Sequence, residues 1–219
     1  MTQWDAIIVA GGRGARLGGV SKPDLSVGGM SLLDRTLAAA APARETVVVG
    51  GPTRAGVTWT VEDPPGSGPA KALAAGLAAL NGHAPWTVVL AVDTPRAADA
   101  VPRLLAALAD AGVKGDAGVK GDAGVKGDAV SAGSGAAGGG GVRARVDGAW
   151  FVDEEGEVQP LLAIYRTAAL LDGTRDLEEG TSMRRLVAGL MMVAVPDVDG
   201  VARDLDTWGD AEFWKERLG

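Results

Sequence analysis

Short apolar runs alternate with segments of helical periodicity along the first half of the chain. Runs such as AIIVA and VVLAV contain no polar position, which is typical of strands buried on both faces of a parallel sheet. They predict strands at residues 6–10, 45–51, 56–63 and 86–93. The segments between them predict helices at residues 31–43, 68–82 and 95–112. This order indicates a mostly parallel sheet with helices on both faces, and a ligand site beyond the carboxyl ends of its strands.

A glycine-rich tract interrupts this alternation. The hexapeptide DAGVKG occurs three times in tandem between residues 110 and 127, and SAGSGAAGGGG follows at 131–141. Composition of this kind indicates a flexible segment. We therefore interpret residues 112–147, approximately, as a flexible insertion within a single domain that spans residues 1–219.

The pattern resumes after the insertion. The stretch AWFVDEEGEVQPLLAIYR predicts two strands within residues 149–166, joined by a turn at 154–156. Further elements are expected as helices near 167–173 and 181–190, strands at 190–198 and 202–206, and a C-terminal helix over 207–219. Together the two halves predict an α/β fold, a three-layer α/β/α sandwich around a mostly parallel, Rossmann-like sheet.

The composition narrows the classes of function. The formal net charge is −7, so no nucleic-acid partner is expected. The chain has no cysteine and one histidine, His83, which excludes thiol chemistry and argues against a Ser-His-Asp triad or a His-rich metal site. Asp5 interrupts the first apolar run, and no run reaches membrane-spanning length. We therefore expect a cytoplasmic protein with no signal peptide and no membrane contact.

The loop that follows the first strand carries the strongest chemical signal. The segment IIVAGGRGARLGGVSKPDLSVGG, residues 7–29, holds seven glycines, whose backbone N–H groups can surround a phosphate. It fails the P-loop pattern, because Pro23 follows Lys22. It also fails the dinucleotide pattern, because position 17 is Leu. It matches the nucleotidyltransferase pattern A-G-G-x-x-x-R-[ML]-G-x-x-x-K at every place, from Ala10 to Lys22.

On these residues the chain resembles the molybdenum cofactor guanylyltransferases, within the wider nucleotidyltransferase fold. Four further blocks match in order: GMSLLDRTL, VEDPPGSGPAKALAAGL, VDTP and QPLLAIYR…TSMRRL…DLDTWGD. The resemblance implies transfer of GMP from GTP to molybdopterin or its molybdenum-loaded form, with Mg²⁺ as the metal and pyrophosphate as the product. It also implies transient contact with molybdoenzymes or with other proteins of cofactor biosynthesis.

Nucleotidyl transfer requires cations that neutralise the charge moving onto pyrophosphate, and a carboxylate that holds Mg²⁺. Arg16 and Lys22 are the candidate cations, and both would also bind the nucleotide. Asp93 ends a buried strand, and the following Thr94 and Pro95 fit the N-cap and N1 positions of the next helix. The Asp93 carboxylate is then not needed to cap the helix, and we expect it to bind the metal.

The same logic applies near the C-terminus. Thr207 and Asp210 fit a capping box for the last helix, which leaves the preceding Asp206 as a second candidate metal ligand or a contact of the second substrate.

The remaining nucleotide contacts are expected along the glycine loop and at the end of the third strand. The candidates are Val9, Ala10, Gly11, Gly12, Asp63 and Gly68. Asp63 could equally be an Asp that opens a turn before proline. Arg96, which relatives replace with a bulky apolar residue, is a candidate contact for an anionic group on the acceptor.

Three other functions stay open. One is cytidylyl or other nucleotidyl transfer onto a different phosphorylated acceptor. Another is a catalytically silent regulator that binds nucleotide. The third is an interaction protein in which the glycine repeats of 112–147 are the functional part.

Overall fold

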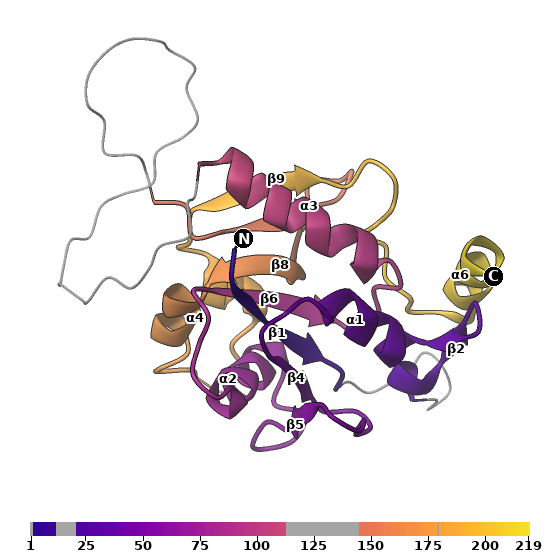
Figure 1. The fold of residues 1–219 in the computed structure, drawn as a ribbon, viewed down its shortest axis with the longest axis horizontal. Helices are drawn as coiled ribbons and strands as arrows, with labels where there is room; N and C mark the ends of the chain where they lie inside the picture. The colour runs from indigo at the N-terminus through magenta and orange to yellow at the C-terminus, as the bar shows by residue number, and fades with distance from the viewer. Residues whose placement is uncertain (1, 12–20, 113–144, 179) are drawn as a thin grey trace, which may run out of the picture.

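The fold is built around one seven-stranded sheet, with the strand order β5-β4-β1-β6-β8-β7-β9 (Figure 1). The computed structural model describes residues 2–11, 21–112, 145–178 and 180–219. Most of the predicted insertion at 112–147, and the predicted site residues Gly12 and Arg16, lie outside these residues. The strands of the sheet are β1 (Trp4–Val9), β4 (Thr46–Val49), β5 (Thr58–Thr60), β6 (Trp86–Ala91), β7 (Gly148–Val152), β8 (Val158–Arg166) and β9 (Met192–Pro196).

The sheet is mostly parallel, as the apolar runs predict. Strands β5, β4, β1 and β6 are parallel to one another, and β9 is parallel to β7. The exception is β8, which pairs antiparallel with both β6 and β7. A tight β7–β8 hairpin forces this reversal, with Gly156 (φ +85°) in its turn.

Helices cover both faces of the sheet, which confirms the three-layer α/β/α prediction (Figure 1). They are α1 (Leu32–Ala40), α2 (Pro69–Ala79), α3 (Ala97–Asp110), α4 (Thr167–Gly173), α5 (Met183–Val187) and α6 (Trp208–Leu218). Strand β1 shows how the layers arise, because its side chains alternate between the faces. Ala6 and Ile8 pack with residues of α1 and α3, whereas Ile7 and Val9 pack with residues of α2.

Local signals place the helix ends. The Ser31 hydroxyl accepts a hydrogen bond from the Asp34 N–H and caps α1. Gly68, with φ +101°, precedes Pro69 at the first position of α2. The predicted capping box of Thr207 and Asp210 is present at the start of α6.

Two predictions about local structure are wrong, and some elements of the glycine-rich segment were not predicted. Residues 202–206 form a loop rather than a strand. Helix α3 begins at Ala97 with Arg96 at the N-cap, so Thr94 does not cap it; the Thr94 carbonyl oxygen instead accepts the Ala97 N–H in a turn. The glycine-rich segment also contains elements that the sequence did not predict, namely the 3-10 helix η2 (Lys22–Asp24) and the hairpin of β2 (Ser26–Val27) and β3 (Met30–Ser31).

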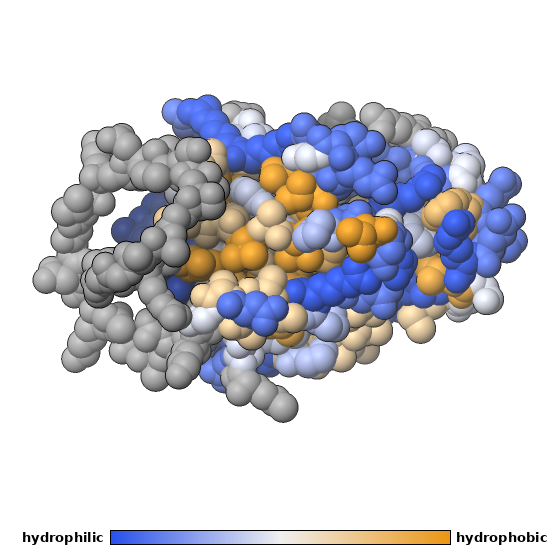
Figure 2. All heavy atoms as spheres, turned by 90° about the horizontal axis from the view of Figure 1, so that it is seen from above, coloured by the Kyte–Doolittle hydropathy of each residue, from blue (hydrophilic) through white to orange (hydrophobic). Residues whose placement is uncertain are grey.

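The surface is mainly hydrophilic on the face seen from above, with apolar residues gathered along its middle (Figure 2). Among the residues that the structure describes, no helix has the length and apolar character needed to cross a membrane.

Candidate active site

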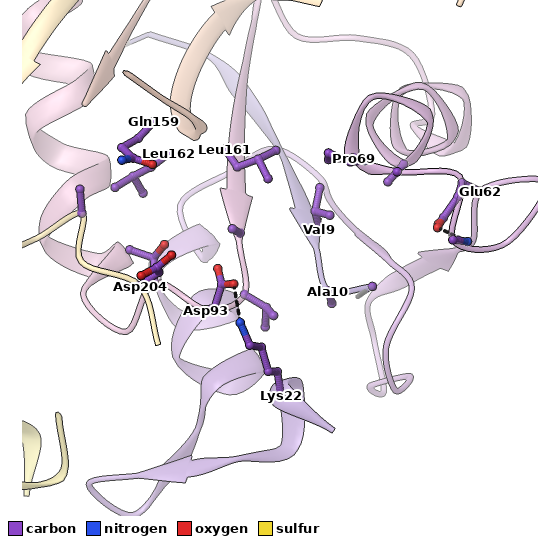
Figure 3. A pocket seen from close by; sticks show the side chains of 18 residues that line it. Val9, Ala10, Lys22, Glu62, Pro69, Asp93, Gln159, Leu161, Leu162 and Asp204 are labelled. Carbon is purple, nitrogen blue, oxygen red and sulfur yellow. Dashed lines mark hydrogen bonds and ion pairs between the residues drawn. The ribbon is translucent and has the colours of Figure 1, made fainter. Parts of the chain in front are cut away.

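A cavity of about 450 Å³ lies beyond the carboxyl ends of β1 and β6, where an open α/β sheet places its ligands (Figure 3). Its lining combines backbone from β1, side chains from the segment after β5, the start of α2, the end of β6, strand β8 and the loop before α6. The lining residues are Val9, Ala10, Gly11, Lys22, Glu62, Gly66, Gly68, Pro69, Ala72, Ala91, Val92, Asp93, Thr94, Gln159, Leu161, Leu162, Ala202 and Asp204.

Lys22 and two carboxylates form the charged cluster of this cavity. The Lys22 Nζ lies 3.0 Å from Asp93 Oδ2 and 2.5 Å from Asp206 Oδ1. Lys22 opens η2, Asp93 follows β6, and Asp206 precedes α6, so three segments distant in sequence converge on one ammonium. Partial burial lowers the pKa of Lys22, but the hydrogen bonds and charges of Asp206 and Asp93 outweigh it, and the pKa is raised overall.

Asp204 adds a third carboxylate that the sequence reasoning missed. It lines the cavity, and its pKa is raised, first by burial and then by the negative charges of Asp206 and Asp93. An Asp-Leu-Asp spacing puts residues 204 and 206 on the same side of an extended segment, which is the signal that could have identified it.

The loop between β9 and α6 is held firmly in place. The buried Asp197 carboxylate accepts the N–H groups of Val201 and Ala202 at 2.7 and 2.9 Å. The Leu205 N–H donates to the Asp93 carbonyl oxygen at 2.8 Å. These bonds fix the backbone that presents Asp204 and Asp206 to Lys22.

The backbone at the end of β1 lies against β4. The N–H groups of Ala10 and Gly11 both donate to the Val49 carbonyl oxygen, at 2.9 and 3.1 Å. A side chain on Gly50, which has φ +73°, would meet the Gly11 Cα at 2.7 Å, so this contact requires glycine. Val9, Ala10 and Gly11 line the cavity. The N–H groups of Ala10 and Gly11 already donate to Val49, so a ligand would contact the surfaces of these two residues and not their N–H groups.

The acid that reaches the cavity after β5 is Glu62 rather than Asp63. Asp63 is exposed and is not among the lining residues. Glu62 is 6% exposed, and its Oε1 accepts the Gly66 N–H at 2.8 Å. Gly68, at the start of α2, lines the cavity beside them.

Arg96 is engaged at the surface. It forms ion pairs with Asp99 at 2.7 Å and Asp199 at 3.5 Å, and it is not among the lining residues of the cavity. Its predicted contact with an anionic acceptor would require these pairs to break.

The carboxylates Asp93 and Asp206 are the described residues that could hold Mg²⁺. No group of three or more His, Asp or Glu side chains arranged for a metal occurs in the described part of the chain. Mg²⁺ commonly takes only one or two protein carboxylates, together with phosphate and water oxygens. The pair of carboxylates that shares Lys22, beside the cavity, fits that requirement.

Comparison with known proteins identifies the family of the chain. The family model described as MobA-like NTP transferase domain matches residues 6–195. The chain belongs to this family. No protein of curated function matches the sequence significantly. The match runs from within β1 to within β9, and so includes every lining residue of the cavity except Ala202 and Asp204.

Solved structures share the fold of this MobA-like NTP transferase domain at low sequence identity. A Mycobacterium sp. strain JC1 homologue of Mycobacterium tuberculosis Rv0371c is 18% identical with a TM-score of 0.64, over 98% of this chain and 96% of that chain. Molybdopterin-guanine dinucleotide biosynthesis protein A from Archaeoglobus fulgidus is 18% identical with a TM-score of 0.59, over 97% of each chain.

A cytidylyltransferase has the same fold. The 2-C-methyl-D-erythritol 4-phosphate cytidylyltransferase from Thermus thermophilus is 19% identical with a TM-score of 0.57, over 96% of each chain. The nucleotidyltransferase-type fold is therefore shared by proteins whose names specify different nucleotides and acceptors.

Proposed function

We propose that this protein transfers GMP from GTP to the phosphate of molybdopterin or its molybdenum-loaded form, releasing pyrophosphate. The observation that carries the proposal is the convergence of Lys22, Asp93 and Asp206 at one side of a cavity that can hold a nucleotide. Membership of the MobA-like family and the likeness to the A. fulgidus protein support this choice of substrates.

In the proposed reaction, an oxygen of the acceptor phosphate attacks the α-phosphorus of GTP. The bond from the α-phosphorus to its bridging oxygen breaks, and that oxygen leaves with pyrophosphate. Lys22, kept protonated by its carboxylate partners, neutralises charge on the phosphates, a role that Arg16 would share. Asp93 and Asp206 would hold Mg²⁺, which supplies further neutralisation when bound.

The acceptor would enter from the side of Gln159 and Asp204, opposite Glu62 (Figure 3). A neighbouring cavity of about 430 Å³ shares Gln159, Ala202 and Asp204 with the first. Between two adjoining cavities, the shared residues lie where the two substrates would meet.

The acidic lining of the neighbouring cavity favours a second candidate. Asp153, Glu154, Glu155 and Asp197 line it together with Asp204, and its cation Arg203 is paired with Asp210. Acidic walls disfavour a strongly anionic acceptor. Cytidylyl or other nucleotidyl transfer onto a different, less anionic phosphorylated acceptor is therefore the alternative, and the T. thermophilus cytidylyltransferase shows that the fold accommodates such chemistry.

A pyrophosphate-release assay tests the proposal. Purified protein with Mg²⁺ is supplied with each of the four ribonucleoside triphosphates, with and without molybdopterin. We expect release only with GTP and molybdopterin together. Release with another triphosphate would assign the sister activity. Tight nucleotide binding without release would indicate another acceptor or the silent regulator.

The proposed function also implies contact with partner proteins. A product delivered to molybdoenzymes implies transient contact with them or with other proteins of cofactor biosynthesis. Co-purification of such a protein with the product-loaded form is the measurement that would support it.

A further inference from the structure

Among the described carboxylates that line the cavity, Glu62 has a buried oxygen without a hydrogen-bond partner. Its Oε1 accepts the Gly66 N–H at 2.8 Å, but its buried Oε2 has no hydrogen-bond partner among the described residues. A buried polar atom without a partner is rare and destabilising. No cation in the described part of the chain pairs with it, in contrast to Asp93 and Asp206, which share Lys22.

Apolar surface lines the cavity that Glu62 shares. Val9, Pro69 and Ala72 line the same cavity with apolar surface, and Gly66 and Gly68 add no side chain. In Figure 3, Glu62 lies at one end of the cavity, and Gln159 and Asp204 lie at the other, with Lys22 and Asp93 between them. A nucleotide with its phosphates at Lys22 would thus direct its base toward Glu62.

We infer that Glu62 selects the base of the donor nucleotide by accepting hydrogen bonds from the N1–H and the 2-amino group of guanine. This inference rests on the proposed function for the placement of the phosphates. An ionised carboxylate is acceptor-only and can accept two parallel hydrogen bonds. Of the four bases, guanine alone presents two adjacent donors on its Watson–Crick edge. Uracil offers one N–H between two carbonyls, whereas adenine and cytosine place a ring acceptor beside their amino groups.

The neighbouring acid is excluded from this role by its position. Asp63 is exposed, whereas Glu62 is buried and fixed by the Gly66 N–H. The oxygen that would accept the hydrogen bonds of guanine therefore belongs to a side chain that is already held in place. Because the side chain is already ordered, less conformational entropy is lost on binding.

The first test changes the ligand and leaves the protein intact. GTP and ITP differ only in the 2-amino group, so their dissociation constants, measured by isothermal titration calorimetry with Mg²⁺, report that single contact. We expect GTP to bind at least about tenfold more tightly than ITP, the usual effect of one hydrogen bond to a charged group. A ratio near one for the wild-type protein would overturn the inference.

The second test assigns the contact to Glu62. Glu62→Gln keeps an oxygen for the Gly66 N–H but turns the other acceptor into a donor, which opposes the donors of guanine. The GTP-to-ITP ratio should fall to about one. Glu45→Gln is the matched control, because Glu45 binds Asn81 at the opposite end of the sheet, and its ratio should match that of the wild-type protein. A thermal melt establishes that each variant is folded.

The outcomes separate this inference from the proposed function. If folded Glu62→Gln keeps the wild-type ratio, the role of Glu62 is wrong, whatever the pyrophosphate assay shows. If the ratio collapses in Glu62→Gln and molybdopterin still gives no release, the assignment of Glu62 stands and the proposed acceptor is wrong.

Discussion

The carboxylates at the two ends of the cavity have different hydrogen-bond and ion-pair partners. At one end, Asp93 and Asp206 share the Lys22 ammonium, and Asp204 lies close enough for its pKa to be raised. At the other, the Glu62 carboxylate has one oxygen bound by Gly66 and one with no partner among the residues that the structure describes. At the first end the protein itself supplies a cation that pairs with two carboxylates, whereas the second is incomplete until a ligand supplies donors.

In the proposed function, the first end is the reaction centre and the second is a recognition site. Paired charges converging from three segments can be exchanged for metal and phosphate as substrates bind. A single fixed acceptor beside apolar lining discriminates between ligands, because a wrong ligand leaves the acceptor unsatisfied. Substitutions at the charged end and in the segments that hold it test this division.

Removal of either member of the ion pair should abolish most turnover. Lys22→Ala and Asp93→Ala are each expected to lower the rate of pyrophosphate release about 10³-fold, the upper range for losing one group that stabilises transition-state charge. Both variants should retain the wild-type preference for GTP over ITP. Asp172→Asn is the matched control, since Asp172 pairs with Arg175 on the surface of α4. Full turnover in either alanine variant would refute the proposed mechanism.

Asp197 should be essential for the geometry of the charged end. Asp197→Ala leaves two buried N–H groups, those of Val201 and Ala202, without an acceptor. We expect the free energy of unfolding to fall by about 3 kcal/mol, measured by urea denaturation. Asp197→Asn, which keeps one acceptor, should lose less. Wild-type stability in Asp197→Ala would show that this loop does not depend on the carboxylate.

The cap of α6 should contribute a smaller amount with a defined pH dependence. Thr207→Ala removes the side chain that accepts the Asp210 N–H, at an expected cost of about 1 kcal/mol. Hydrogen bonds from Thr207 lower the pKa of Asp210 to about 2. A lowered carboxyl pKa stabilises the fold above the unfolded value of 3.8, and this stabilisation is lost as the pH falls toward about 2.

Thermal melts of Thr207→Ala across that range provide the measurement. The difference in Tm from the wild-type protein should be constant above pH 4 and shrink between about pH 4 and pH 2, the range set by the Asp210 pKa. A difference that persists unchanged at pH 2 would contradict the role of Asp210 in the cap.

Asp204 should give the smallest effect and the opposite sign. Burial and the charges of Asp206 and Asp93 raise its pKa, so its ionisation destabilises the folded protein. Asp204→Asn should therefore raise the Tm at pH 7, and the gain should vanish below the unfolded pKa of 3.8. A lower Tm at pH 7 would mean that Asp204 makes a stabilising contact that outweighs the charge repulsion.

Much of this architecture could be predicted from the amino-acid sequence. The apolar runs at 6–10 and 86–93 correspond to β1 and β6, and the charged residues Lys22, Asp93 and Asp206 were identified from the loop pattern and from helix-cap logic. Part of that logic was wrong, because Arg96 rather than Thr94 occupies the N-cap position of α3, and its side chain makes no capping hydrogen bond. Asp93 nevertheless lines the cavity, because it follows the end of β6 at the carboxyl edge of the sheet.

The acidic pair at 62 and 63 shows where sequence reasoning stops. Side chains alternate in direction along an extended segment, so a shift of one residue decides which acid enters the cavity. The sequence suggested Asp63, and the fold brings Glu62 into the cavity instead.

The alternation of strands and helices, the glycine loop and the charged residues after the central strands follow from the sequence alone, because they depend on local periodicity and backbone sterics. The packed fold is needed to bring Lys22 between Asp93 and Asp206 and to place Asp204 near them. It also leaves one oxygen of Glu62 without a partner among the described residues. These features depend on distances between segments far apart in the chain, and such distances arise only when the sheet and its two helix layers pack together.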